Sequence, residues 1–179
     1  MGTVEAVHRS GQHEFSKARE DQVDLVAGLG VAGDCHAGAQ VQHRSRVRRD
    51  PTQPNLRQVH LVAGELLDEL AAAGHDVGPG DLGENVTTRG VDLLGLATGA
   101  TLRLGPDALV TVTGLRNPCR QIEAFSTGML ARVAHRDHDG TVVRRAGVMG
   151  VVVLGGTVSP GDQVLVAPPP GEPVPLAPV

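Results

Sequence analysis

The stretch AGVMGVVVLGGTV, residues 146–158, indicates the fold class of this chain more clearly than any other segment. It sets β-branched valines between glycines, and short β-branched runs bounded by glycine are typical of strands. ATLRLG (100–105), ALVTVTGL (108–115) and DQVLVA (162–167) have the same character. Many short strands separated by turn residues predict a mostly β protein of the barrel or sandwich type.

Three further strands are expected in the first half of the chain, in TVEAVHRS (3–10), QVDLVAGLG (22–30) and LGENVTT (82–88). Two segments instead show the apolar spacing of helices. In residues 59–74 the stripe consists of Val59, Val62, Leu66 and Leu70, and a second stripe after the chain's second cysteine consists of Ile122, Phe125, Met129 and Val133.

Composition excludes several classes of function. Hydrophobic residues make up 40% of the 179 residues but aromatic residues only 1%, so the core must be built from Val, Leu and Ala. With no Trp or Tyr and a net charge of −4, a nucleic-acid-binding surface is not expected. No run of 18 apolar residues and no signal peptide are present, so no membrane span is expected. We expect one domain over residues 1–167 and a flexible Pro-rich tail over 168–179.

Cys119 is one of two cysteines and lies in the stretch TGLRNPCRQIEAF, residues 113–125. Two cysteines make no disulfide scaffold, which favours a reducing, cytoplasmic compartment. Asn117 suits a helix N-cap and Pro118 the first helical position, which would place Cys119 in the first turn. The helix dipole and the flanking Arg116 and Arg120 would then favour the thiolate, predicting a reactive or metal-ligating cysteine. The alternative is a small buried apolar residue at a helix start.

A second polar cluster is GDCHAG, residues 33–38, which contains Asp34, Cys35 and His36. Its first glycine completes a G-x-G-x-x-G pattern beginning at Gly28, but no helical stripe follows, so a turn explains the glycines better than a dinucleotide site. Zinc ligation lacks the usual C-x-x-C spacing. The H-x-x-H formed by His135 and His138 has the surroundings of an exposed turn.

Basic and polar residues elsewhere suggest an anion pocket. If residues 41–48 are extended, Arg44, Arg46 and Arg48 project to one side and could hold a phosphate. The alternative is a solvated charged face. In PGDLGENV (79–86), Glu84 and Asn85 follow glycines in a turn that would aim polar groups into a pocket.

Several of these segments, taken in order, resemble the MOSC domain, the C-terminal domain of molybdenum cofactor sulfurase. The segments that carry the likeness are GDCHAG, RQVHLVAGELLDEL, PGDLGENVTTRGVDLLGL, GATLRLG and VTGLRNPC, and the likeness runs from about Val31 to Val166. The most similar members are small stand-alone bacterial proteins. The resemblance implies a mostly β, barrel-like fold with a few peripheral helices.

The resemblance also implies a chemistry. The family's cysteine matches Cys119, which would ligate molybdenum in a pterin cofactor or carry sulfur as a persulfide. Pyridoxal phosphate binding is associated with the family, but the only lysine is Lys17, in a polar stretch, so no Schiff base is expected. Without a desulfurase domain, the chain would depend on a partner, either an electron-donor protein or a cysteine desulfurase.

Two hypotheses follow from this resemblance. In the first, the protein is a molybdenum-dependent oxidoreductase that reduces N-hydroxylated compounds, with Cys119 as metal ligand and with Asp34 and His36 as catalytic groups. Its cofactor-binding residues would be Arg44, Arg46, Arg57, Glu84, Asn85, Arg89, Arg116 and Asn117. In the second, the protein is a sulfur carrier for metal–sulfur cofactor assembly, with a persulfide on Cys119. A cysteine hydrolase, with His36 or His60 as base, is a third possibility.

Overall fold

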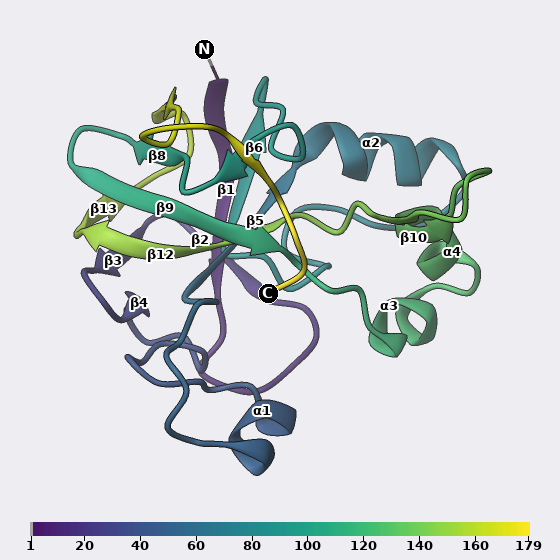
Figure 1. Cartoon of the computed structure of the whole chain (residues 1–179), viewed down its shortest axis with the longest axis horizontal. Coiled ribbons are helices and arrows are strands. Elements are labelled where there is room, and N and C mark those ends of the chain that lie inside the picture. Colours follow the sequence, from purple (N-terminus) through teal and green to yellow (C-terminus); the bar gives the residue numbers. More distant parts are fainter. Residues whose placement is uncertain (1) are drawn as a thin grey trace.

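A closed barrel of seven strands forms the centre of the computed structural model, which describes residues 2–179 (Figure 1). Neighbouring strands in the ring are hydrogen-bonded, and the last strand pairs with the first. In ring order the strands are β14 (Gln163–Ala167), β8 (Thr101–Leu104), β9 (Ala108–Leu115), β12 (Val148–Leu154), β5 (Val59–Ala63), β6 (Val86–Arg89) and β1 (Gly2–Arg9). The prediction of a mostly β, barrel-like fold is therefore confirmed.

Strand β1 closes the barrel because it pairs on both sides. Its first residues pair with β14, with Gly2 opposite Val164, and the strand also pairs with β6, with Val7 opposite Val86. The register with β6 shifts between Val4 and Ala6, and such a bulge bends a strand as barrel closure requires. All ring pairs are antiparallel except β5 with β6, which is parallel.

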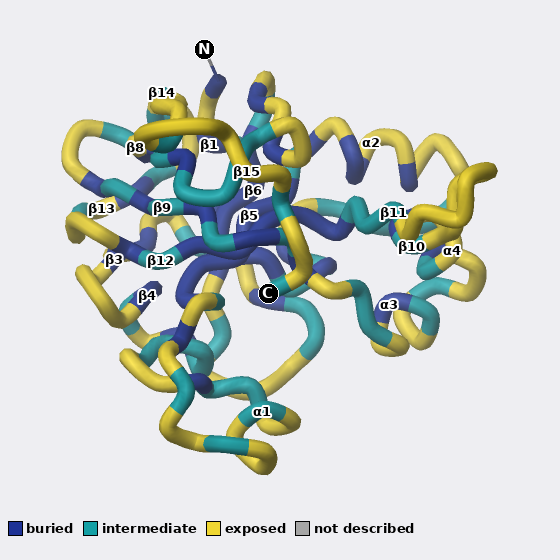
Figure 2. The backbone as a smooth tube through the Cα atoms, viewed as in Figure 1, coloured by how far each residue is buried: buried dark blue, intermediate teal, exposed yellow. Residues whose placement is uncertain are grey.

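The barrel interior is filled by Val, Leu and Ala side chains, as the composition requires. Figure 2 shows the buried stretches of the chain in dark blue, and they gather in the barrel strands. Leu61, Leu102, Leu104 and Val110 are fully buried in it. On β9 buried and half-buried residues alternate, which is the period of a strand with one face on the core. A second apolar cluster lies outside the barrel wall, between Val62 and the helices of the right-hand side of Figure 1.

Short elements surround the barrel. The remaining strands are β2 (Ala18–Glu20), β3 (Val23–Val26), β4 (Gly30–Val31), β7 (Ala97–Thr98), β10 (Ala134–Arg136), β11 (Val142–Arg144), β13 (Gly156–Val158) and β15 (Val174–Pro175). The helices are α1 (Arg44–Arg49), α2 (Gly64–Ala72), α3 (Arg120–Phe125) and α4 (Met129–Val133). Among residues 2–179, none of these helices has the length and apolar character needed to cross a membrane.

The predicted helix over residues 59–74 is wrong in its first third, which is strand β5. Val59 and Leu61 point into the barrel, whereas Val62 packs against α2 on the outside. With both faces covered, the strand loses its polar–apolar alternation, and a continuous apolar run cannot be distinguished from a helix by period alone. The helix α2 begins only at Gly64.

The expected helix after Cys119 is two helices. Gly128 has φ +83°, a left-handed conformation that ends one helix and starts another, and it separates α3 from α4. Ile122, Met129 and Val133 are nevertheless buried together, as the stripe predicted. The expected extended segment 41–48 is also wrong, because residues 44–49 form α1, and their arginines therefore do not share one side of a strand.

The Pro-rich tail expected over residues 168–179 contains a short strand, β15. Val174 pairs with Thr98, and the backbone of Leu115 donates to Ala177 and accepts from Val179. Leu176 packs against the barrel core. The proline-rich segment is thus bonded across the barrel, where it passes over β9 in Figure 1.

Candidate functional site

A cleft of about 340 Å³ lies where the 13–17 segment, α1, the ends of β5 and β6, and the start of α3 meet. Its lining is basic and contains several histidines. The lining residues are His13, Glu14, Phe15, Lys17, His36, His43, Arg44, Ser45, Arg48, Arg57, His60, Leu82, Gly83, Asn85, Arg116, Gln121 and Met149.

The loop between β4 and β5 forms one wall of the cleft and is held by two buried amides. Asn55 Nδ2 donates to the carbonyls of His36 and Gly38, each at 2.9 Å. Gln58 Nε2 donates to the Gly28 carbonyl at 2.8 Å, and its Oε1 accepts from Val152 N on the barrel. These hydrogen bonds fix the conformation of a polar loop for which the sequence predicts no regular secondary structure.

Asp34 is a buried anchor of this wall. Lys17 Nζ lies 2.7 Å from Asp34 Oδ2, and both side chains are at most 3% exposed. The same oxygen accepts from Asn85 Nδ2 at 3.0 Å, while Asp34 Oδ1 accepts from the His36 backbone at 2.9 Å. Burial alone would raise the pKa of Asp34, but the bonds from His36 and the Lys17 charge outweigh it and lower that pKa. The aspartate is therefore anionic at neutral pH.

Histidines gather beside Asp34. His36 Nδ1 lies 3.2 Å from Asp34 Oδ1, and the His36 ring lies 4.5 Å from that of His43 and 5.3 Å from that of His13. Burial, reinforced by Arg57, lowers the pKa of His43 to about 3. His60 is also buried, its Nε2 is 2.8 Å from the Ala146 carbonyl, and burial lowers its pKa. His43 and His60 are thus neutral groups in a positively charged cleft.

Two arginines reach the cleft from buried positions. Arg57 Nε and Arg116 Nη1 are buried, and neither has a hydrogen-bond partner within the described chain. Burial, with the charges of Arg46 and Arg116, lowers the pKa of Arg57 to about 10, so it stays charged at neutral pH. Buried charged donors are normally paired, because an unpaired one loses its hydration without compensation. The pair therefore points to an anion bound in the cleft.

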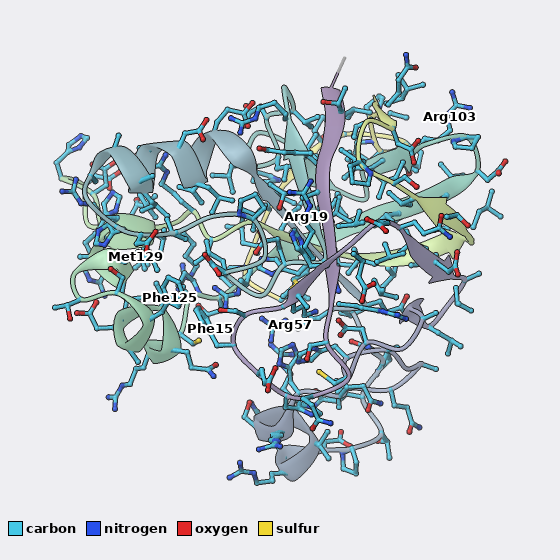
Figure 3. The ribbon with its side chains drawn as sticks, turned by 180° about the vertical axis from the view of Figure 1, so that it is seen from behind. Phe15, Arg19, Arg57, Arg103, Phe125 and Met129 are labelled. Atoms are coloured by element: carbon cyan, nitrogen blue, oxygen red, sulfur yellow. The ribbon has the colours of Figure 1, made fainter. Side chains whose placement is uncertain are left out.

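Phe15 forms the apolar side of the cleft. Arg116 lies over its ring, with the guanidinium carbon 6.0 Å from the centroid. The ring centroid of Phe125 lies 5.7 Å from that of Phe15, and Figure 3 shows the two side chains near each other. Gly83 makes this packing possible, since its φ is +78° and a Cβ there would come 2.4 Å from the Phe15 carbonyl. The glycine before Glu84 and Asn85 is thus required both by its turn and by close backbone contact.

Cys119 lies at the edge of the arginine pair. It occupies the N-cap position of α3 with extended backbone, φ −125° and ψ 169°, so the prediction of a place in the first turn is wrong. The helix starts one residue later, at Arg120, because Asn117 does not cap it: its Oδ1 accepts from Arg144 instead, at 3.2 Å. Burial lowers the pKa of Arg116, and the neighbouring Cys119 side chain, which hydrogen-bonds the guanidinium, opposes this lowering.

Five of the residues expected at the site line the cleft: His36, Arg44, Arg57, Asn85 and Arg116. Asp34 and Cys119 contact lining residues directly. Arg46 does not line the cleft, although its charge acts on Arg57. The structure thus brings together groups that lie up to 85 positions apart in the sequence, from Asp34 to Cys119.

Three expected residues lie elsewhere. Glu84 is fully buried behind the cleft wall, where it accepts from Gly80 N, and burial raises its pKa. Arg89 is paired with Glu5 at 2.8 Å and with Asp68, away from the cleft. Asn117 is exposed and bonded to Arg144.

The sequence reading missed four contributors: His13, Phe15, Lys17 and His43. The first three lie in the polar segment 13–17, which has no strand or helix pattern, and only their position beside GDCHAG in space gives them a role. Lys17 in particular is buried against Asp34 rather than solvated. Being the only lysine in the chain was a signal that could have drawn attention to it.

Two patterns are resolved as turns. Gly28 and Gly30 lie in the hairpin of β3 and β4 and Gly33 lies in the turn after β4, and no helix directly follows them. A Cβ on Gly30 would come 2.7 Å from the Gln58 carbonyl, which explains that glycine by close packing. His135 and His138 are exposed in the β10–β11 hairpin, so the expected exposed turn is confirmed.

Comparison with known families agrees with this architecture. The family model for the MOSC domain matches residues 33–165, which is most of the chain, and the chain therefore belongs to the MOSC domain family, a family associated with the molybdenum cofactor. A search of curated protein sequences found no match.

Solved structures share the fold. The YuaD protein from Bacillus subtilis is 25% identical, with a TM-score of 0.73 over 93% of this chain and 96% of that one. YiiM from Escherichia coli is 21% identical, with a TM-score of 0.60 over 97% of this chain and 73% of that one. YiiM from Geobacillus stearothermophilus is 14% identical, with a TM-score of 0.62 over 93% and 75%. The likeness to the two YiiM proteins concerns the fold alone.

Proposed function

We propose that the cleft binds the molybdenum-pterin cofactor and that Arg57 and Arg116 hold its phosphate. The observation that carries this proposal is the pair of buried guanidinium atoms, Arg57 Nε and Arg116 Nη1, without partners in residues 2–179. Guanidinium groups bind phosphate oxygens through charge-assisted hydrogen bonds, which are the strongest that a neutral-pH site can offer. Arg44 and Arg48 add positive charge to the same cleft.

Cys119 is the proposed ligand of molybdenum. A thiolate is a soft donor that suits molybdenum, and Cys119 lies beside the Arg116 guanidinium. Besides this contact with Arg116, Cys119 Sγ makes a long contact of 3.5 Å to Gln121 Oε1, and this half-buried sulfur is available to a ligand. When bound, the molybdenum centre would supply the redox chemistry by which an N-hydroxyl group is reduced.

Reduction of an N-hydroxyl group to N–H and water consumes two electrons and two protons, and Asp34 and His36 would help to supply the protons. His36 Nδ1 lies 3.2 Å from Asp34 Oδ1, and His36 lines the cleft, so the imidazole can hold a proton at Nδ1 with a buried carboxylate behind it. Asn85, bonded to Asp34 Oδ2, fixes the orientation of that carboxylate. Electrons would come from a separate donor protein in the cytoplasm.

The second candidate function is a sulfur carrier, and the half-buried, weakly bonded Cys119 supports it. A cysteine desulfurase would deliver sulfur to this thiolate as a persulfide. In that case pyridoxal phosphate belongs to the desulfurase, since the only lysine here is paired with Asp34. The cationic cleft then serves to stabilise the persulfide anion rather than a phosphate.

One experiment separates the two functions. The full chain and Cys119→Ser are purified from a host that makes the pterin cofactor, and molybdenum, pterin and sulfane sulfur are measured. Stoichiometric molybdenum and pterin in the wild type, with molybdenum lost in Cys119→Ser, support the reductase. Sulfane sulfur on Cys119 without metal supports the carrier, and the absence of all three contradicts both. N-hydroxyl reduction with an artificial reductant then tests the activity itself.

A further inference from the structure

A cluster of soft and borderline ligands lies at the rim of the cleft, separate from Cys119. His13, Cys35 and His36 each offer a ligand atom, and these atoms lie within 4.8 Å of one another. Cys35 Sγ is 3.2 Å from His36 Nδ1, and the rings of His13 and His36 are 5.3 Å apart. Two imidazoles and one thiol at such separations are the donor set of zinc and related transition metals.

We propose that His13, Cys35 and His36 form a binding site for a transition-metal ion of the Zn²⁺ class. Three protein ligands leave one coordination position open, which is the arrangement of catalytic rather than structural zinc sites. His13 and His36 both line the cleft, so an ion they hold has its open position toward the cleft. The ligand for that position would be water or an anionic oxygen of a bound substrate.

The surroundings of the cluster have the features of an outer ligand shell. Asp34 lies beside the cluster and holds the His36 backbone, whose N–H donates to Asp34 Oδ1 at 2.9 Å, and Asp34 is itself fixed by Lys17 and Asn85. His13 Nε2 lies 3.1 Å from the Gln42 carbonyl. When Nε2–H donates to that carbonyl, Nδ1 is the unprotonated nitrogen and can bind a metal ion. Carboxylates and carbonyls that hold ligating histidines in this way are typical of metal sites.

The backbone of the cluster is equally constrained. Cys35 N donates to the Ser10 carbonyl at 2.8 Å, which joins the GDCHAG turn to the end of β1 and brings the 10–13 segment beside it. Asn55 holds the His36 carbonyl from the other side. The ligands therefore come from two segments tied together by hydrogen bonds, so little reorganisation is needed to bind an ion. The proposal does not depend on the molybdenum cofactor.

Cobalt titration tests the site directly, because a thiolate bound to Co²⁺ gives a charge-transfer band that imidazole ligands do not give. Co²⁺ alone is added to the reduced, metal-free full chain, and Zn²⁺ is then used to displace it. We expect one equivalent bound with the thiolate band. Cys35→Ser should abolish the band, and His13→Ala should weaken binding by more than about 100-fold, since even outer-shell partners contribute 10–100-fold.

Cys119→Ser is the matched control, since it removes the other thiol and should leave the band unchanged. Loss of the band in Cys119→Ser with retention in Cys35→Ser would place the ion at Cys119 and overturn the proposal, as would the absence of stoichiometric binding to the wild type. Circular dichroism checks that each variant is folded. If Cys35→Ser does not fold, the His13→Ala variant provides the test, and an unchanged Co²⁺ affinity of that variant would overturn the proposal. Molybdenum content of Cys35→Ser, expected to match the wild type, keeps this test distinct from that of the proposed function.

Discussion

The barrel interior and the cleft beside it differ in the kind of side chain that they bury. The barrel core consists of apolar side chains from every strand of the ring, with Leu102 and Val110 fully buried among them. The cleft instead buries charged groups: Lys17 and Asp34 are paired, whereas Arg116 Nη1 has no hydrogen-bond partner in the described residues. A buried charge without a partner destabilises a fold. Its presence in the cleft therefore indicates that the cleft serves binding rather than stability.

The largest expected effect on stability comes from the paired charges of the cleft wall. Lys17→Met leaves Asp34 buried without its cation, and breaking such a pair lowers the free energy of unfolding by about 3–5 kcal/mol. The measurement is urea unfolding. Arg9→Met is the control, since Arg9 pairs with Glu20 at the surface, where solvent screens the pair, and its loss should have a much smaller effect on the free energy of unfolding. Equal effects of the two substitutions would contradict the account of this wall.

A cavity in the barrel should have nearly as large an effect. Leu102→Ala removes a fully buried side chain from the core and should lower the free energy of unfolding by about 2–5 kcal/mol. Val153→Ala on β12, where the side chain is half exposed, should change it by less than about 1 kcal/mol. A Leu102→Ala protein as stable as the wild type would show that the barrel is not the stabilising core.

Acid should weaken the fold through His8, which is buried and unpartnered within the chain described. Burial, with the charges of Arg19 and Lys17, lowers the pKa of His8 to about 4. The unfolded state binds a proton near pH 6.5, but the native state does not until about pH 4. Stability is therefore lost as pH falls through this window, by about 2–3 kcal/mol. Denaturant unfolding across that range tests this.

His8→Met isolates this contribution, because it keeps the volume and removes the titrating group. The variant should show a flatter stability profile between pH 6.5 and 4 than the wild type. His43 contributes in the same sense, so some slope remains. Asp34, whose pKa is lowered, affects stability only at more acidic pH, below the value of an unfolded aspartate. Identical profiles for the two proteins would mean that His8 is protonated in the fold.

The smallest effect is expected for the C-terminal segment. Deleting residues 169–179 removes β15, the bonds to Leu115 and the packing of Leu176, which together should lower the free energy of unfolding by about 1–2 kcal/mol. Leu176→Ala should reproduce part of the loss, and Val174→Ala, at a position 60% exposed, should not. A melting temperature unchanged by the deletion would show that the segment does not stabilise the barrel.

The fold was easier to predict than the cleft for a physical reason. Strands such as ALVTVTGL carry their own alternation, and β9 matches that stretch from Ala108 to Leu115. The local pattern fails where tertiary packing covers both faces of a strand. Strand β5 is covered on both faces, so its continuous apolar run predicts a helix instead. Gly128, which divides α3 from α4, was visible only as a weakness in the helical stripe.

The cleft depends on contacts that no local pattern encodes. GDCHAG and the stretch ending at Cys119 were recognisable as motifs, yet Lys17 acquires its role only from Asp34, and His13 only from the loop beside it. Arg57 and Arg89 look alike in the sequence, but one is buried in the cleft and the other is held at the surface by Glu5 and Asp68. Burial and pairing, which separate them, are properties of the folded chain.

The contrast between the cleft arginines, Arg57 and Arg116, and the surface-paired Arg89 provides the most direct test of the central claim, that the cleft arginines hold the pterin phosphate. Molybdenum and pterin are measured in the wild type, Arg116→Gln and Arg89→Gln, each purified from a host that makes the cofactor. The account predicts stoichiometric cofactor in the wild type and Arg89→Gln. It predicts a loss of about 2–5 kcal/mol in binding, seen as near absence of cofactor, in a folded Arg116→Gln protein. Full cofactor content in Arg116→Gln would contradict it.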